Sequence, residues 1–209
     1  MSKVRVANFT VSLDGYGSGA NQRLDAPFGD RAGELHEWME LAMAAREKGL
    51  TDPAVEQLDR FKDGVGATIM GRNMFGPERG EWADESWRGW WGENPPYHHD
   101  TFVLTHHARP SLKMEGGTTF HFTSDPIEVV LERAREVADG KDVVIAGGAS
   151  TVRQYLRAGL IDEVDMFIAP VFTGAGERPF DDIGDAMAEF TVESMVGVPK
   201  ATLVKLRRA

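Results

Sequence analysis

The sequence predicts one α/β domain, residues 1–209, with a mainly parallel central sheet flanked by helices and a C-terminal antiparallel hairpin. Apolar runs of strand length alternate with segments of helical period along most of the chain. The tail, residues 189–208, instead alternates apolar and polar positions around a Gly-Val-Pro turn. Because helical crossovers join parallel strands and tight turns join antiparallel ones, this order predicts an antiparallel edge on a parallel sheet.

The strands are predicted from β-branched or apolar runs bounded by turn residues. The run VRVANFTV stops at the turn-rich SLDGYGSG, which begins a long polar loop, and the run VVIA stops at a pair of glycines. By this criterion, strands are expected at residues 4–11, 67–72, 101–105, 118–123, 143–146 and 163–172.

The helices are predicted from apolar residues at helical spacing and from their end signals. In the first helical segment these residues are Leu35, Trp38, Met39, Ala42 and Ala45. Gly49 ends this segment, and an Asp-Pro pair starts each of two later helices. Helices are therefore expected at residues 31–48, from Asp52 onward, from Asp125 onward, and at 150–158.

Residues 77–100 form a segment without either regular period. It reads PERGEWADESWRGWWGENPPYHHD and holds four of the five tryptophans of the chain. We interpret it as a long insertion in the single domain. Its aromatic side chains are suited either to a flat apolar pocket for a heterocycle or to packing over the sheet edge or a second subunit.

Composition excludes several classes of function. The formal net charge of −10 disfavours nonspecific binding to nucleic acid or to an anionic membrane, because both need a basic face. The chain has no cysteine, which excludes disulfides, thiolate nucleophiles and Cys-ligated zinc. No run of about 18 apolar residues and no signal-peptide pattern occurs, so we expect a cytoplasmic protein with no membrane partner.

Three short motifs follow predicted strands. VVIAGGASTVR joins a strand through two glycines to a helix, which leaves backbone N–H groups at the positive end of the helix dipole, where anions bind. TIMGR and VLTHH also place polar residues at strand ends, where open α/β sheets bind ligands. Taken singly, each motif has a structural explanation, namely a tight turn, a surface arginine and solvated histidines.

Further candidates lie near the first strand and in the histidine pairs. Asp14 and Gly15 form a turn in SLDG, while Glu34 and Glu37, with His36 between them, start the first long helix. Neighbouring histidines on a strand point to opposite faces and no H-E-x-x-H motif occurs, so no metal site is predicted.

Taken together, these motifs resemble the dihydrofolate reductase-like superfamily. The stretches that carry the resemblance are FTVSLDGYGSG, TIMGRNMFGP, VLTHHARP and VVIAGGASTVRQYLRAGLIDEVDMFIAPVFTGAGERPF. They are most similar to the reductase (C-terminal) domain family of the bifunctional riboflavin-biosynthesis deaminase-reductase, as a stand-alone member. The resemblance covers nearly the whole chain, while residues 77–100 look like an elaboration.

The resemblance implies an extended NADPH site at the strand ends. The strand end with Gly71, Arg72 and Asn73 would bind the adenosine side, with Arg72 near the 2′-phosphate, and Thr105 and His106 would line the same pocket. The glycine turn would carry the pyrophosphate through Gly147, Gly148, Ala149, Ser150 and Thr151. Ala7 and the turn at residues 12–15 would flank the nicotinamide.

The resemblance also implies an NADPH-dependent oxidoreductase that transfers a hydride to a small planar heterocycle, such as a pterin or an aminopyrimidine, and that forms a homodimer. Such chemistry needs orientation and a proton source rather than a triad or a metal. Asp14, Glu34, Glu37 or ordered water would supply the proton. The apolar Ile145, where the riboflavin reductases carry an acidic residue, argues against their ribityl phosphate substrate. A noncatalytic NADP-binding or regulatory dimer and a purely structural dimer are the alternatives.

Overall fold

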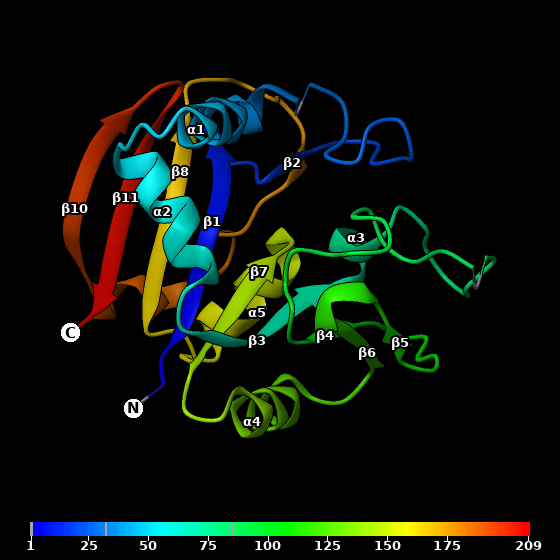
Figure 1. Cartoon of the computed structure of the whole chain (residues 1–209). Helices are drawn as coiled ribbons and strands as arrows, with labels where there is room; N and C mark the ends of the chain where they lie inside the picture. The colour runs from blue at the N-terminus through cyan, green and yellow to red at the C-terminus, as the bar shows by residue number, and fades with distance from the viewer. Residues whose placement is uncertain (1, 32, 85) are drawn as a thin grey trace.

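The structure, a computed structural model, describes residues 2–31, 33–84 and 86–209. In these residues nine strands form one sheet, in the order β10-β11-β8-β1-β7-β3-β4-β6-β5 (Figure 1). The strands are β1 (Val4–Ser12), β3 (Val65–Gly71), β4 (Asp100–Leu104), β5 (Leu112–Lys113), β6 (Thr119–Thr123), β7 (Asp142–Gly147), β8 (Glu163–Ala169), β10 (Phe190–Val198) and β11 (Ala201–Arg208). A separate pair joins β2 (Ser18–Gly19) to β9 (Gly176–Glu177).

The centre of the sheet is parallel and both edges are antiparallel. Strands β8, β1, β7, β3, β4 and β6 pair in parallel. Strand β11 is antiparallel to β8 and forms a hairpin with β10, while β5 is antiparallel to β6. The predicted fold class, including its C-terminal hairpin, is therefore confirmed.

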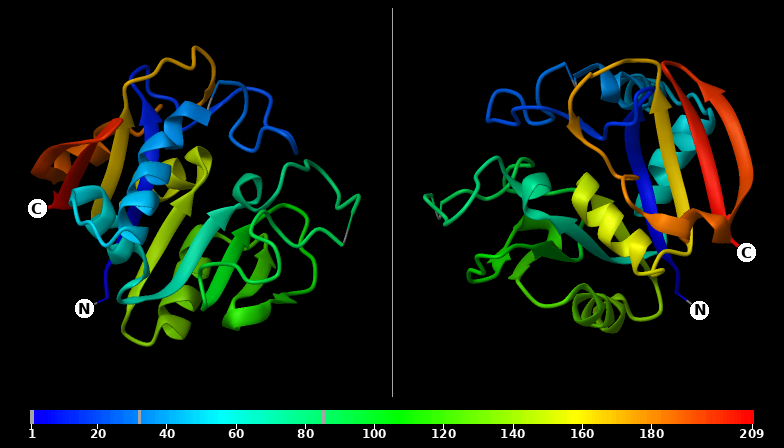
Figure 2. Two further views of the ribbon diagram at one scale, coloured as in Figure 1. Left: turned by 45° about the horizontal axis from the view of Figure 1, so that its top comes forward. Right: turned by 180° about the vertical axis from the view of Figure 1, so that it is seen from behind.

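Helices lie on both faces of this sheet (Figure 2). They are α1 (Glu37–Glu47), α2 (Pro53–Lys62), the short α3 (Arg72–Phe75), α4 (Ile127–Ala138) and α5 (Ala149–Arg157), with 3-10 turns at η1 (Gly33–His36), η2 (Glu115–Gly117) and η3 (Gly184–Glu189). Helices α4 and α5 pack over β1, β3 and β7 in the largest apolar cluster. Helices α1 and α2 cover the other face, where Trp38 stacks on Phe167 of β8 at 3.4 Å between ring centroids.

The helix ends follow the expected signals with one correction. Asp52 caps α2 by accepting hydrogen bonds from the backbone N–H groups of Ala54 and Val55, at 2.8 and 2.9 Å, and Pro53 occupies the first turn. The helix expected at 31–48 is shorter than predicted. Its first turn is the 3-10 segment η1, and the α-helix begins only at residue 37.

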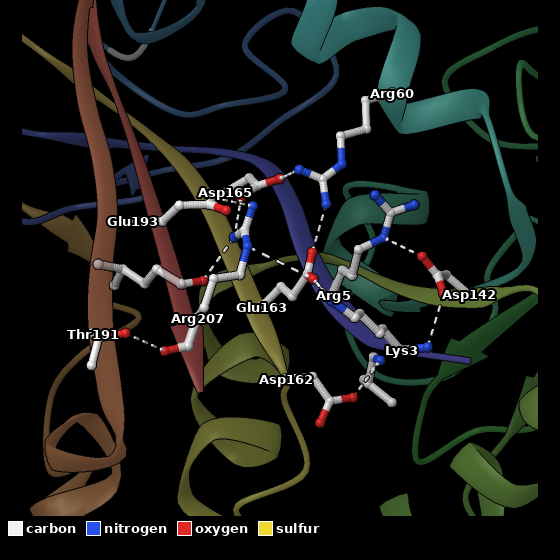
Figure 3. Close-up of polar contacts among 12 residues, drawn as sticks. Lys3, Arg5, Arg60, Asp142, Asp162, Glu163, Asp165, Thr191, Glu193 and Arg207 are labelled. Atoms are coloured by element: carbon white, nitrogen blue, oxygen red, sulfur yellow. Dashed lines mark hydrogen bonds and ion pairs between the residues drawn. The ribbon is translucent and has the colours of Figure 1, made fainter. Parts of the chain in front are cut away.

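A cluster of charged side chains lies under α2 at the amino ends of β1 and β8 (Figure 3). Glu163 and Asp165 of β8 are 2% and 1% exposed. Arg60 of α2 approaches Glu163 at 2.6 Å, and Arg207 of β11 approaches Asp165 at 2.6 Å. Burial of these carboxylates would cost several kcal/mol each without such partners, so the pairs fasten α2 and β11 to the sheet.

Candidate functional site

A cavity of about 930 Å³ lies along the carboxyl ends of β3, β4, β6 and β7. Residues 7–10 of β1 form part of its floor. This size lies near the upper end for small-molecule and cofactor sites. Because the strands are parallel, the polar residues predicted after β3, β4 and β7 gather at this edge.

The glycine turn after β7 forms one wall of the cavity. The Gly147–Gly148 peptide bond is cis and Gly147 has a φ of +130°, a conformation that only glycine adopts readily. A Cβ placed on Gly148 would meet no atom within 4 Å, so the space in front of the turn is open. Helix α5 starts at the next residue, and its first residues, 149–151, line the cavity, so the positive end of its dipole lies at the cavity wall, as a phosphate site requires.

The turn after β3 packs tightly against this one. A Cβ on Gly71 would lie 2.5 Å from Oγ1 of Thr151, which is buried. Glycine at position 71 is therefore needed for the close approach of the two turns. Gly71, Asn73 and residues 147–151 all line the cavity.

Arg72 begins α3 and lines the cavity, yet it is only 8% exposed. Its terminal nitrogens donate to the backbone oxygens of Gly80 and, at 3.4 Å, Glu81. Its guanidinium carbon lies 3.7 Å from the ring centroid of Trp82. Burial lowers the pKa of Arg72, although an arginine remains cationic. The neighbouring insertion thus holds this guanidinium in one plane.

Thr105 and His106 follow β4 and also line the cavity. The Thr105 hydroxyl accepts a hydrogen bond from the backbone N–H of His107 at 3.1 Å, which closes the turn. Across the described residues, no group of three or more His, Cys, Asp or Glu side chains is arranged to hold a metal ion.

Strand β1 contributes Ala7 and a bulge at Asn8. The pairing with β8 shifts between Ala7 and Phe9, and Asn8 has a φ of +57°, which asparagine tolerates better than most residues. Ala7, Asn8 and Phe9 all line the cavity, so the bulge turns this strand toward the site.

The two acidic candidates lie outside the described lining of the cavity. The Asp14 carboxylate accepts hydrogen bonds from the Ser12 hydroxyl at 2.5 Å and from the backbone N–H of Gly174 at 2.8 Å. These bonds, with that of Ser12 foremost, lower the pKa of Asp14. Asp14 therefore ties the turn after β1 to the loop after β8. Glu34 is exposed in η1.

Several lining residues were not singled out as ligand contacts from the sequence. Met39 and Met43 extend from α1 into the cavity at i, i+4 spacing, a signal that could have identified a second face of that helix. His36 stacks on Phe28, with 3.9 Å between ring centroids. From the insertion come Trp90, Trp91, Pro96 and Tyr97. Trp82, also of the insertion, packs against Phe75 of α3 and Phe122 of β6.

Comparisons with known proteins agree on one family. The family model of the RibD C-terminal domain matches residues 3–205. The riboflavin biosynthesis protein RibD of Mycobacterium tuberculosis (strain H37Rv) is 33% identical over 73 residues, which are 35% of this chain and 20% of that relative. The chain thus aligns with about a fifth of the relative's length.

Two solved structures show the same fold. Acinetobacter baumannii RibD superposes with a TM-score of 0.57 at 16% identity, covering 100% of this chain and 58% of that one. A pyrimidine reductase-like protein from Corynebacterium diphtheriae superposes with a TM-score of 0.56 at 14% identity, covering 100% and 92%. The expected reductase-like fold is therefore confirmed. No helix in the described residues is long and apolar enough to span a membrane.

Proposed function

The chain belongs to the RibD C-terminal domain family, and on this premise we propose that it is an NADPH-dependent reductase. Its acceptor would be a small planar heterocycle such as a pterin or an aminopyrimidine. The observation that carries the proposal is the Gly147–Gly148 turn at the N-terminus of α5, which lines the cavity of about 930 Å³.

The residues present fit an extended dinucleotide. Gly147, Gly148 and the first residues of α5 offer backbone N–H groups and two hydroxyls to a pyrophosphate. The turn after β3, with Arg72 and Asn73, and the turn after β4, with Thr105 and His106, would hold the adenosine and its 2′-phosphate. Ala7 and the bulge beside it would face the nicotinamide. Bound there, NADPH would supply the hydride.

The chain's own contribution would be orientation, exclusion of water and a proton source. Phe28, Met39, Met43, Trp90 and Trp91 give the cavity broad apolar walls against which a flat ring can pack. Such walls exclude water from the reacting atoms, and they bind neutral aromatic rings better than charged chains.

The proposed reduction also needs a proton source. Asp14 is anionic and bound to the loop at Gly174, and Glu34 is exposed, so ordered water is the source that we favour. Asp14→Asn and Glu34→Gln test the two carboxylates. If a carboxylate donates the proton, its variant should lose turnover while its affinity for NADPH stays unchanged. If Asp14 only holds the loop, Asp14→Asn should lower the melting temperature instead.

We further propose a cytoplasmic homodimer, as family membership implies. The outer strand β10 is mostly exposed and carries the apolar Val192 and Met195, at 63% and 61% exposure. An edge strand of this kind with apolar side chains is suited to pairing with a second copy.

The test is a comparison of cofactors followed by turnover. NADPH should raise the melting temperature more than NADH does, because a ligand stabilises the native state it binds. Oxidation of NADPH, followed by its near-ultraviolet absorbance, should then accelerate with at least one compound in a panel of pterins and aminopyrimidines. Binding without turnover across the panel would instead favour a noncatalytic NADP-binding protein. No stabilisation by either nucleotide at millimolar concentration would contradict both.

A further inference from the structure

Trp82 is the point at which the insertion meets the ends of β3 and β4. Its indole Nε1 donates a hydrogen bond to the backbone oxygen of His107 at 2.5 Å. Its ring packs edge-on against Phe75 and Phe122, with centroids 6.1 and 5.3 Å away. One half-buried side chain therefore connects three segments that are distant in sequence.

The same ring lies against two guanidinium groups. The guanidinium carbons of Arg72 and Arg109 are 3.7 and 4.2 Å from its centroid. Cations are attracted to the face of an indole more strongly than to any other side-chain ring, and the attraction grows when water is excluded. Arg72 is 8% exposed, so water is largely excluded from its contact with Trp82.

The contacts fix the plane of Arg72 without using all of its donors. The backbone oxygens of Gly80 and Glu81 each accept one hydrogen bond from a terminal nitrogen. A guanidinium carries more N–H groups than these two carbonyls require. Its buried Nε has no hydrogen-bond partner among the described residues, and Arg72 lines the cavity together with Arg79, His106 and His107. A phosphate at this end would be surrounded by groups that bind it.

We propose that Trp82 is a positioning residue for cofactor selection, which orients the Arg72 guanidinium toward the 2′-phosphate that distinguishes NADPH from NADH. The inference rests on the proposed function and adds to it a role for the insertion. An arginine fixed in one plane loses less rotational freedom when it binds a phosphate than a mobile arginine does.

The experiment uses the full chain and four ligands, namely NADPH, NADH, 2′,5′-ADP and 5′-AMP, measured by titration calorimetry. Trp82→Leu removes both the ring face and the indole N–H, while Trp82→Phe keeps a ring face. Trp87→Leu is the matched control, because Trp87 lies in the same insertion and its indole donates to the backbone oxygen of Phe75 at 3.0 Å, while its ring packs on Trp90 and not on Arg72.

Trp82→Leu should weaken NADPH and 2′,5′-ADP roughly tenfold, as expected for loss of a desolvated cation–π contact. NADH and 5′-AMP should change less than about twofold, since neither carries the 2′-phosphate. Trp82→Phe should retain most of the selectivity, and Trp87→Leu should leave the NADPH-to-NADH affinity ratio unchanged.

Two results would overturn the inference, and they are distinguishable. If the wild type binds NADPH and a folded Trp82→Leu keeps the wild-type affinity ratio, Trp82 does not position Arg72, while the proposed function stands. If the wild type binds none of the four ligands, the proposed function fails and the inference fails with it. If Trp82→Leu does not fold, the NADPH-to-NADH affinity ratio can be measured for Trp82→Ala in the presence of a stabilising osmolyte.

Discussion

Replacing Arg207 by methionine should destabilise the fold by about 3 kcal/mol. Its Nη1 lies 2.6 Å from Oδ1 of Asp165, and its Nη2 lies 2.7 Å from Glu193. Arg207 is 17% exposed in its side chain and Asp165 is 1% exposed (Figure 3). Removing one partner of such a pair leaves a buried carboxylate with fewer compensating charges.

The magnitude depends on the partners that remain. Breaking a buried pair typically costs about 3–5 kcal/mol. Asp165 keeps Arg60 at 3.3 Å and the amide of Gln57 at 3.2 Å, which places the expected loss at the lower end of that range. For a domain of this size, that loss corresponds to a melting temperature lower by about 6–12 °C.

The assay is urea unfolding at neutral pH, with Arg135→Met as the control. Arg135 forms a 2.8 Å pair with Glu132 on the surface of α4, where both side chains are more than a third exposed, so its removal should have almost no effect. Equal effects of the two substitutions would refute the view that the cluster under α2 holds the sheet and its helix together.

The pH dependence provides a second check on the same substitution. Burial raises the pKa of Glu163, but its bonds to Lys3, Arg207 and Arg60 outweigh this effect, and the net pKa is lowered. A lowered carboxylate pKa adds stability above the unfolded value of 4.5, and this stability is lost as the pH falls through the folded value. The penalty of Arg207→Met should therefore shrink below about pH 4.5.

Three further predictions concern the turn after β3, a half-buried histidine and the sheet edge. Gly71→Ala should weaken NADPH binding about tenfold, because its Cβ would lie 2.5 Å from Oγ1 of Thr151. Titration calorimetry measures this affinity. Gly33→Ala is the control and should have no effect, because its Cβ would meet nothing within 4 Å. Burial lowers the pKa of His99 from 6.5 to about 4. Between these two values only the unfolded state binds the proton, so the free energy of unfolding should fall by up to about 1.4 kcal/mol for each unit by which the pH is lowered. His99→Gln, which keeps a partner for Thr68, should flatten that slope in denaturation curves, and an unchanged slope would contradict the assignment. Met195→Glu should convert a dimer to a monomer in light scattering, while Val129→Glu on exposed α4 should not; a dimer that persists would place the interface elsewhere.

The glycine turn could be predicted because its determinants are local. An apolar strand, two glycines and a hydroxyl-bearing helix start are adjacent in sequence, and β7, Gly147–Gly148 and α5 follow in that order in the structure. The strands expected at 67–72 and 101–105 follow from equally local patterns, and each ends one residue earlier than expected, at Gly71 and Leu104. Their gathering at one edge then follows from parallel strand order.

What the sequence could not reveal depends on contacts between distant segments. The Asp14 carboxylate accepts a hydrogen bond from a loop 160 residues away, a contact that no local pattern encodes. Arg72 also packs against Trp82, whose segment has no regular period. The charged cluster at Glu163 and Asp165 left a signal, since two carboxylates inside an otherwise apolar strand imply buried partners.

The most direct test of the central claim is a crystal structure of the chain with NADPH. The account predicts the pyrophosphate against the backbone N–H groups of residues 148–151, the 2′-phosphate at Arg72 and the nicotinamide beside Ala7. A nucleotide bound away from the Gly147–Gly148 turn, or a cavity that stays empty at saturating NADPH, would contradict it.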